Sequence, residues 1–195
     1  MRSLFALVLL LVAASAVRAE EAIPSPFRED RIFAGSIAAA EALGVPARKV
    51  SGLTVPHHLL AADLIARAFL LARDNRYDRI IFLTPDHFKR SRRPFATTRR
   101  SFDTVYGPVP ADVAAVETLL ADPALVEESG LFAREHGITG ILPYVARFFP
   151  GTPVVPVAVT IASNRAEWEA MVAALAPLVT ERTLVIQSTD FSHYL

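Results

Sequence analysis

Three segments of the chain place histidines or carboxylates directly after an apolar stretch that is predicted to be a buried strand. They are Val-Pro-His-His at 55–58, Leu-Thr-Pro-Asp-His at 83–87 and Ser-Thr-Asp-Phe-Ser-His-Tyr at 188–194. In an open α/β sheet, ligands bind outside the carboxyl ends of the strands. We therefore expect the three segments to meet at one edge of a sheet. The remaining histidine, His136, directly precedes a predicted helix and can reach the same edge.

Such a set of side chains is typical of a metal site with a proton-transfer group beside it. Neutral imidazole is the commonest ligand for divalent first-row metals, and two histidines leave positions open for substrate or water. We expect one of the adjacent His57 and His58 to be a metal ligand, and a functional role for His87. His193, Asp190 and His136 are further candidates for the same site. A nearby histidine can move protons because its pKa lies close to the working pH, and a carboxylate can fix the tautomer of a ligand.

Several of these residues also have an ordinary structural explanation. His57 and His58 are adjacent, so at most one is expected to point at the site while the other packs or caps the next helix. His57 is favoured because it follows the proline directly. Asp86 either fixes a histidine tautomer or caps a turn, and Asp190 could likewise be a structural cap. Tyr144 is expected in the core or at its rim.

The chain contains no cysteine, and its formal net charge is zero. Disulfides, thiolate ligands and a cysteine nucleophile are thereby excluded, so a metal must be bound by imidazole and oxygen atoms. Neither a basic surface nor an acidic tail is indicated. We therefore expect a small-molecule substrate or ligand as the partner, and no nucleic acid.

Residues 1–19 have the pattern of a secretory signal peptide. A short basic start is followed by an apolar run at 4–12 and by small residues that end in Val-Arg-Ala at 17–19. The apolar run is shorter than the roughly 20 residues that span a bilayer. We therefore expect cleavage near Glu20, an exported, periplasmic protein, and no stable membrane anchor after cleavage.

Strands and helices alternate along the rest of the chain. Apolar patterns predict strands at 48–55, 79–84, 153–161 and 182–187, and helices at 37–43, 59–73, 112–120, 138–149 and 164–178. Residues 102–109 are expected to form an edge strand or a loop. The alternation is typical of a three-layer α/β domain with a mainly parallel sheet and helices on both faces. We divide the chain into a signal peptide (1–19), an N-terminal segment (20–46) and one α/β domain (47–195).

The periodicity also predicts which side chains face inward. One face of the helix at 59–73 carries Leu60, Leu64, Ala68 and Leu71, and the helix at 164–178 is expected to turn Trp168, Met171, Val172 and Leu175 inward. Asn164 and Glu167 are predicted to cap the start of that second helix. Pro156, inside the strand predicted at 153–161, favours a bulge or an edge position there.

Taken together, the motifs resemble those of the Memo-like family, also described as AmmeMemoRadiSam system protein B. Members of this family look like class III extradiol dioxygenases in fold. The matching segments are 55–58, 83–87, 135–144 and 190–194, with a looser match at 103–112. The resemblance covers the chain from about Val50 onward, and the segment at 190–194 is its most specific part.

The resemblance implies roles for individual residues. It implies that His57 and His87 bind a divalent metal, with iron favoured over copper or zinc. It implies that His193 takes the position of the acid/base histidine of the dioxygenases, with Asp190 beside it. His136 would line the same pocket.

The chain also departs from the family pattern. Thr139 and Ile141 stand where the family has a glutamate and a second histidine. Family members continue beyond the last motif, and their remaining metal ligand lies there. We therefore expect a C-terminally incomplete domain whose open sheet is covered by a protein partner or an oligomer. The third ligand would be a carboxylate such as Asp190 or Asp86, or would lie beyond residue 195.

Three functions are compatible with these observations. The first is a non-haem metal-dependent enzyme of dioxygenase-like architecture, which the convergence of three histidine motifs favours. The second is a non-catalytic metal or small-ligand binding module, which Thr139, Ile141 and the absent third ligand favour. The third is a metal-assisted hydrolase, since a metal-bound water and a histidine base would suffice.

Overall fold

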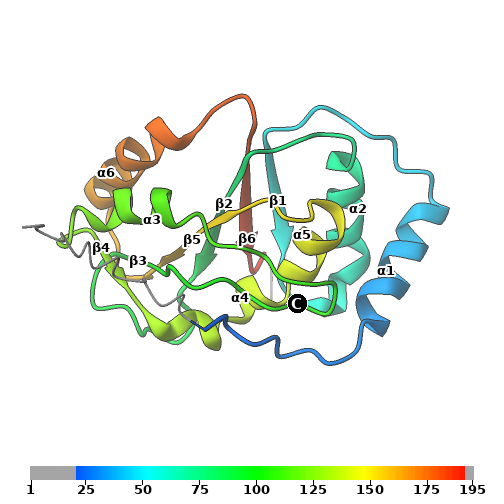
Figure 1. The fold of residues 1–195 in the computed structure, drawn as a ribbon, viewed down its shortest axis with the longest axis horizontal. Coiled ribbons are helices and arrows are strands. Elements are labelled where there is room, and N and C mark those ends of the chain that lie inside the picture. The colour runs from blue at the N-terminus through cyan, green and yellow to red at the C-terminus, as the bar shows by residue number, and fades with distance from the viewer. Residues whose placement is uncertain (1–20, 192–195) are drawn as a thin grey trace, which may run out of the picture.

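The computed structural model describes residues 21–191, which form a sheet flanked by helices (Figure 1). The strands of this region are β1 (Gly52–Pro56), β2 (Arg79–Pro85), β3 (Phe95–Thr97), β4 (Val126–Glu128), β5 (Val154–Val159) and β6 (Thr183–Thr189). Their order across the sheet is β1-β6-β2-β5-β3-β4. The first four strands in this order are parallel, whereas β3 is antiparallel to β5 and parallel to β4. The predicted mainly parallel α/β sheet is confirmed.

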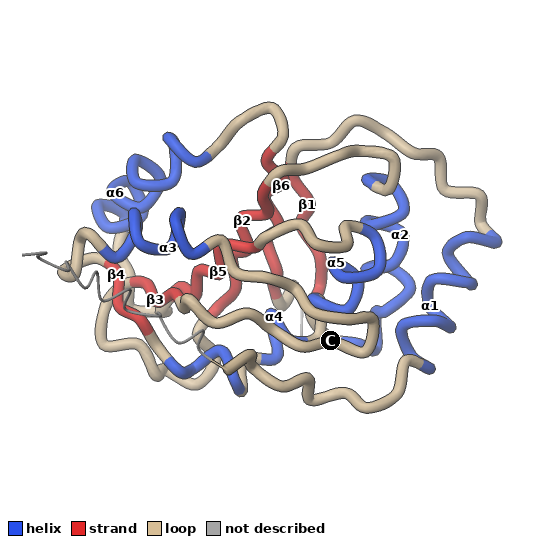
Figure 2. Tube along the Cα trace, viewed as in Figure 1, coloured by secondary structure: helices blue, strands red, loops and turns tan. Residues whose placement is uncertain are grey.

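Helices cover both faces of the sheet, so the three-layer prediction is also confirmed. The α-helices in the described residues are α1 (Arg31–Ala42), α2 (Ala62–Ala72), α3 (Val113–Leu120), α4 (His136–Thr139), α5 (Leu142–Phe148) and α6 (Arg165–Leu175). Helices α1, α2 and α5 lie on one side of the strands, and α3 and α6 lie on the other (Figure 2). The N-terminal segment contributes to the core through Phe33 and Ile37 of α1.

Strand β2 shows how the sequence produces two hydrophobic cores. Successive side chains of a strand point to opposite faces of the sheet. Ile80 and Phe82 accordingly belong to the core under α1, α2 and α5, and Ile81 belongs to the core under α3 and α6. A strand buried on both faces must be apolar at every position, which explains the continuous apolar run.

The helix predicted at 138–149 is two helices, and that prediction was wrong. Helix α4 ends at Thr139, and Pro143 lies in the first turn of α5. Proline lacks the amide hydrogen that a helix interior requires but is tolerated in the first turn. The break therefore falls just before the proline, and the short α4 is free to carry His136 to the sheet edge.

The predicted inward faces of α2 and α6 were also partly wrong. In α2 the buried residues include Ile65, Phe69 and Leu70, whereas Leu64 is exposed, as is Leu60 in the 3-10 turn that precedes the helix. This helix is apolar on nearly all sides, so periodicity alone does not select the face that packs. In α6 Met171 is buried, but Trp168 and Val172 are exposed.

Pro156 lies in an interior strand at a local gap in hydrogen bonding. On the side of β5 that faces away from β2, Val154 bonds with the backbone of Pro110 and Asp112, and β3 pairs with the strand only at Ala158 and Val159. Residues at even spacing along a strand direct their amides to the same side. Pro156 therefore sits where no partner strand requires an amide, and Thr97 Oγ1 donates to its carbonyl oxygen at 2.7 Å.

Residues 102–109 form a loop, within which Phe102 and Val109 make an isolated antiparallel bridge. The predicted cap of α6 is confirmed, because Asn164 and Glu167 form a capping box. The predicted signal peptide at 1–19 and His193 lie outside the described residues. Within residues 21–191, no helix has the length and apolar character needed to cross a membrane.

Candidate functional site

Three parallel strands end at the same edge of the sheet, and each places one predicted site residue there. His57 is the first residue after β1, His87 is the second after β2, and Asp190 is the first after β6. Strand β6 lies between β1 and β2, so Asp190 lies between the two histidines. The fold thus brings together residues that are far apart in the sequence.

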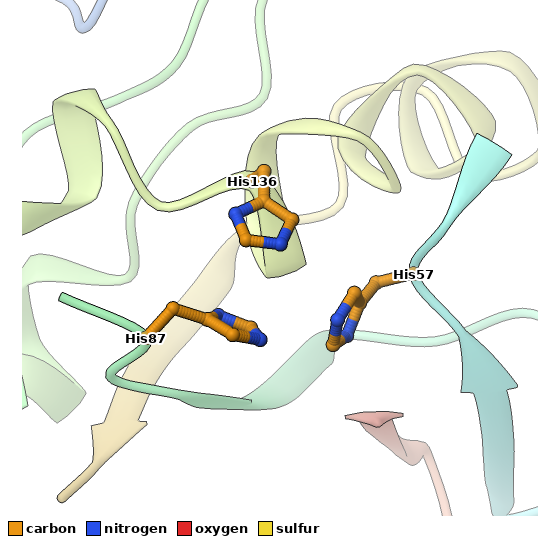
Figure 3. Close-up of side chains that lie close together, drawn as sticks. All are labelled: His57, His87 and His136. Carbon is orange, nitrogen blue, oxygen red and sulfur yellow. The ribbon is translucent and has the colours of Figure 1, made fainter. Parts of the chain in front are cut away.

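Short helix α4 adds a third imidazole to this edge. In Figure 3 the rings of His57, His87 and His136 turn toward one another from three different elements. Their ring centroids are separated by 4.7 Å for His57–His87, 5.2 Å for His57–His136 and 4.2 Å for His87–His136. One nitrogen from each ring lies within 4.8 Å of the others, which is close enough for the three to hold one metal ion.

His57 is the most enclosed of the histidines that the structure describes, with 2% of its surface exposed. Its Nδ1 lies 3.1 Å from Ser188 Oγ, and its Nε2 lies 2.7 Å from Asp190 Oδ1. Burial lowers the pKa of His57 to about 4, although the Asp190 carboxylate acts in the opposite direction. The imidazole is therefore neutral at physiological pH, as a metal ligand must be.

His87 is held by a fully buried carboxylate that the sequence analysis did not assign to the site. Its Nδ1 lies 2.6 Å from Glu135 Oε1, and its backbone amide donates to Glu135 Oε2 at 3.1 Å. Glu135 also accepts from the Gly137 amide at 2.8 Å and so begins α4. Its side chain has no exposed surface. The other ring nitrogen of His87 is directed at the cluster.

His136 stands at the open side of the cluster and is half-exposed. Its Nδ1 lies 3.8 Å from Glu135 Oε1. Burial and the neighbouring His87 lower the pKa of His136 below its usual value. A neutral imidazole at this position can accept a proton from a group bound in the cluster.

Asp190 contacts imidazoles on both sides. Besides its 2.7 Å contact with His57, its carboxylate lies 3.4 Å from His87 Nε2 and 3.6 Å from His58 Nε2. His57, His58 and Asp190 form a second group with the spacing of a metal site. His58 makes no side-chain cap, so the expectation that only one histidine of the adjacent pair would approach the site was wrong.

Asp86 serves the loop after β2. Its Oδ2 accepts from the Ser91 amide at 2.7 Å, and among the described residues it belongs to neither group with metal-site spacing. Burial opposes ionisation of this carboxyl, but the hydrogen bonds from the amides of Ser91 and Arg90 outweigh it and hold the pKa of Asp86 below its usual value. The turn-capping alternative is the one that the geometry matches.

Tyr144 lies in the core, as expected, whereas Trp168, which was predicted to face inward, is exposed and borders the cavity described below. Tyr144 is fully buried, its hydroxyl lies 2.8 Å from Ser36 Oγ, and burial raises its pKa to about 12. Trp168 is half-exposed and donates from Nε1 to Ser163 Oγ at 2.6 Å.

A cavity of about 590 Å³ opens beside the histidines. His87 and Asp190 line one part of it, and Leu83, Ile161 and Trp168 are among its apolar lining residues. Cavities of 300–1,000 Å³ with apolar walls and a few polar groups are typical of small-molecule sites. The arrangement therefore places space for a small ligand directly against the cluster.

Sequence reasoning missed three residues that hold the cluster together, namely Glu135, Gly137 and Ser188. Ser188 Oγ donates to the Gly137 carbonyl oxygen at 2.5 Å and also meets His57. A Cβ on Gly137 would collide with Thr84 Oγ1, so only glycine fits there. Ser188 could have been found from strand periodicity, since it lies two residues before Asp190 on the same strand end.

Comparison with known proteins relates the chain to one family. The family model for Memo-like protein matches residues 36–195. A MEMO1 family protein of Thermotoga maritima is 30% identical over 149 residues, which cover 73% of this chain and 53% of the relative. MEMO1 family proteins of Thermotoga sp. strain RQ2 and Thermotoga neapolitana are 28% identical over 149 and 148 residues, with the same coverage of each chain.

The chain spans about half the length of the curated relatives that it matches. The family model, by contrast, matches most of this chain and includes every histidine described above. The resemblance deduced from the motifs is therefore confirmed, and the chain belongs to the Memo-like protein family.

Proposed function

We propose that this chain carries a mononuclear divalent-metal site of a dioxygenase-like enzyme of the AmmeMemoRadiSam protein B type, with His57 and His87 as ligands. One observation carries the proposal. The Nε2 atoms of both histidines face the carboxylate of Asp190, at 2.7 Å and 3.4 Å. Two imidazole nitrogens and one carboxylate, from three strand ends, thus lie close together.

The residues present fit a metal ion. His87 Nε2 is buried and has no hydrogen-bond partner within residues 21–191, although the Nδ1 of the same ring is firmly bonded. A buried polar atom without a partner usually indicates a missing water or ion. Two imidazoles and a carboxylate supply nitrogen and oxygen donors of the kind that divalent first-row metals accept.

Iron is the favoured metal, with copper and zinc as alternatives. Two histidines and one carboxylate are the ligand set of non-haem Fe(II) oxygenases, and here Asp190 supplies the carboxylate. When bound, such a metal would polarise an oxygen atom of a substrate or of water. The reaction itself is left open.

The surrounding residues would handle protons and position the substrate. His136 lies beside the cluster as a neutral imidazole that can accept a proton, and His193 is proposed as a further acid/base group. The cavity of about 590 Å³ supports a small-molecule substrate with an apolar body that packs against Trp168 and Ile161. His87 and Asp190 line this cavity and would therefore face the bound substrate.

A non-catalytic binding module is the second candidate, and the two departures from the family motif favour it. Thr139 is buried and donates to the Glu135 carbonyl oxygen, and Ile141 is buried in the core. Both side chains therefore serve packing and leave the site with fewer proton-transfer groups. A metal-assisted hydrolase has the same ligand requirements and is separated from the first candidate by its substrates.

We also propose the cellular location and the partners of the protein. The pattern of residues 1–19 supports export to the periplasm without a stable membrane anchor. A net charge of zero argues against nucleic acid as a partner. Exposed Trp168, Val172 and Ile161 support a protein partner or an oligomer that covers this side of the sheet.

Metal titration tests the proposal. The metal-free chain would be titrated with Fe(II) under anaerobic conditions, and with Zn(II) by calorimetry. We expect one metal ion per chain in the wild type, and loss of binding in His57→Ala and His87→Ala. Glu117→Gln is the matched control, because this exposed carboxylate pairs with Arg99 away from the cluster. Absence of stoichiometric binding by the wild type would overturn the metal site.

Activity assays separate the candidate functions. Turnover of catechol-type substrates by the Fe(II)-loaded chain, lost in His193→Ala, supports the dioxygenase-like enzyme. Cleavage of esters or phosphoesters instead supports the hydrolase. Metal binding without turnover of either substrate class supports the binding module.

A further inference from the structure

We propose that a second cavity, next to the histidine cluster, binds the phosphate group of a small molecule between Arg90 and Arg134. The cavity has a volume of about 500 Å³, and among the described residues it shares no lining residue with the cavity beside the histidines. Its lining includes Phe88, Ser129 and Leu131 besides the two arginines, and it is called the arginine cavity below. The inference goes beyond the proposed function, because it concerns other residues and requires no metal.

One wall of the arginine cavity is the loop that follows β2. Phe88 and Arg90 line the arginine cavity, whereas His87 and Lys89 line the cavity beside the cluster. Asp86 holds this loop in place: its carbonyl oxygen accepts from the Lys89 amide at 3.3 Å, and its buried side chain accepts a further loop amide at 2.7 Å. The backbone that carries Arg90 is therefore fixed, although the side chain itself is exposed.

The other wall is the 3-10 turn at Gly130–Ala133 with the residues at its two ends. Leu131 is buried, and the Arg134 amide donates to its carbonyl oxygen at 2.9 Å. The next residue in the chain is the fully buried Glu135. The backbone of Arg134 is thus anchored on both sides, and its side chain lines the cavity from an exposed position.

The two arginines leave the cavity with an uncompensated positive charge. They are the charged residues that line it, and within residues 21–191 neither guanidinium forms an ion pair or a hydrogen bond. The acids of the adjacent strand β4 are already occupied, because Glu127 and Glu128 pair with arginines outside the cavity. A hollow lined by charges of one sign concentrates ions of the opposite sign. The expected ligand is therefore an anion.

The chemistry of the lining favours phosphate over a carboxylate. A phosphate monoester carries close to two negative charges at neutral pH and so matches two guanidinium groups, each of which presents paired N–H donors that fit phosphate oxygens. Ser129 Oγ accepts from the Leu131 amide at 3.3 Å, so its hydroxyl hydrogen can be donated to a third phosphate oxygen. A single carboxylate would neutralise only one of the two charges.

The apolar part of the lining indicates what the phosphate is attached to. Phe88 is half-exposed, and its ring lies edge-on to His136 with 6.0 Å between the ring centroids. An apolar or aromatic body that packs against Phe88 would lie beside the open side of the histidine cluster. A cavity of this volume suits a small phosphate ester, whereas the phosphates of a membrane surface would meet exposed charges on a flat face.

Calorimetric titration of the metal-free chain with inorganic phosphate and with phenyl phosphate, at constant ionic strength, tests the proposal. We expect one phosphate site per chain. Arg90→Gln and Arg134→Gln should each weaken binding at least about 10-fold, since each removes hydrogen bonds to a charged group. Arg134→Lys keeps the charge but loses the paired donors, so its affinity should lie between those of Arg134→Gln and the wild type.

Arg93→Gln is the matched control. Arg93 belongs to the same exposed loop and its replacement removes the same charge, but it does not line the arginine cavity. We expect this variant to bind phosphate as the wild type does. Denaturant unfolding checks that all the variants are folded, as expected for exposed side chains.

Phe88→Ala tests the apolar wall separately from the charges. Phenyl phosphate should bind the wild type about 2- to 10-fold more tightly than inorganic phosphate, which is the usual gain from pairing two aromatic rings. In Phe88→Ala this difference should disappear while the affinity for inorganic phosphate stays the same. A preserved difference would place the phenyl ring elsewhere and contradict the proposed position of the ligand.

The remaining outcomes each decide against the arginine cavity. They are a wild type that binds neither phosphate probe, or an equal loss of affinity in Arg93→Gln, which would assign the effect to the overall charge of the loop. Binding to phosphatidylglycerol vesicles that phenyl phosphate does not displace would assign the arginines to a membrane surface. None of these results depends on the metal site, because the titrated chain is metal-free.

Discussion

The imidazole of His57 is buried, and its protonation is coupled to folding. Burial lowers its pKa from 6.5 to about 4, so between these values the unfolded chain binds more protons than the folded chain. The stabilisation is therefore complete above pH 6.5 and is lost as the pH falls toward 4, by about 3 kcal/mol. Urea unfolding of the metal-free chain at pH 7.5 and pH 4.5 measures this loss.

Two variants isolate the contribution of His57 from those of other titrating groups. His57→Gln and His57→Asn should both lose less stability on acidification than the wild type, because neither carries the buried imidazole. Equal pH dependence in His57→Gln and the wild type would contradict the prediction.

Gly137 tolerates no side chain. Gly137→Ala should destabilise the chain by about 1–3 kcal/mol and weaken metal binding, because the new Cβ must displace Thr84 or His87. Gly130→Ala is the control, since a Cβ there meets no atom within 4 Å. Thermal unfolding and zinc titration measure the two effects. If Gly137→Ala were as stable as Gly130→Ala, the side chains of Thr84 and His87 would have to move aside at little cost in free energy.

At the residue scale, the sequence allowed part of the site to be predicted. His57, His87 and Asp190 each follow an apolar strand directly, so the rule for strand ends was sufficient to bring them together. Glu135 was missed because it acts on His87, which lies 48 positions away in the chain. Local patterns do not report such pairs.

Helix α6 begins with a capping box and borders the cavity through Trp168. Asn164 accepts hydrogen bonds from the amides of Ala166 and Glu167, and Glu167 accepts from the Asn164 amide. Asn164→Ala should therefore lower the free energy of unfolding by about 1 kcal/mol. Asn164→Asp keeps an acceptor and should stay near the wild type in denaturant unfolding. An Asn164→Ala chain with the same free energy of unfolding as the wild type would mean that packing alone holds this helix end.

At the scale of elements, predictions succeeded where one physical effect dominated. Strand β2 was placed to within one residue because a strand buried on both faces is apolar throughout. The inward face of α2 was misjudged because apolar residues surround it, and tertiary packing made the choice. The break between α4 and α5 followed from Pro143, whose effect the periodicity of the surrounding apolar residues concealed.

For the whole molecule, the proposed metal should act as a stabilising ligand. A ligand at 100 times its dissociation constant stabilises the folded state by about 2.7 kcal/mol, which raises the melting temperature of a domain of this size by on the order of 5–10 °C. Zinc should produce such a rise in the wild type, and a chelator should reverse it. The His87→Ala chain should show no zinc-dependent change, and a rise of equal size in that variant would place the binding elsewhere.

The central position of β6 has a consequence for the order in which the molecule assembles during synthesis. Strands β1 and β2 leave the ribosome early, yet neither pairs with the other, because β6 supplies the hydrogen bonds between them. Until residues 183–189 emerge, the middle of the sheet stays open and exposes unpaired strand edges, which are prone to aggregate. Pairings between such distant segments also form slowly. We therefore expect the nascent chain to depend on chaperones until residues 183–189 emerge, and His57, His87 and Asp190 to meet only once β6 has paired with β1 and β2.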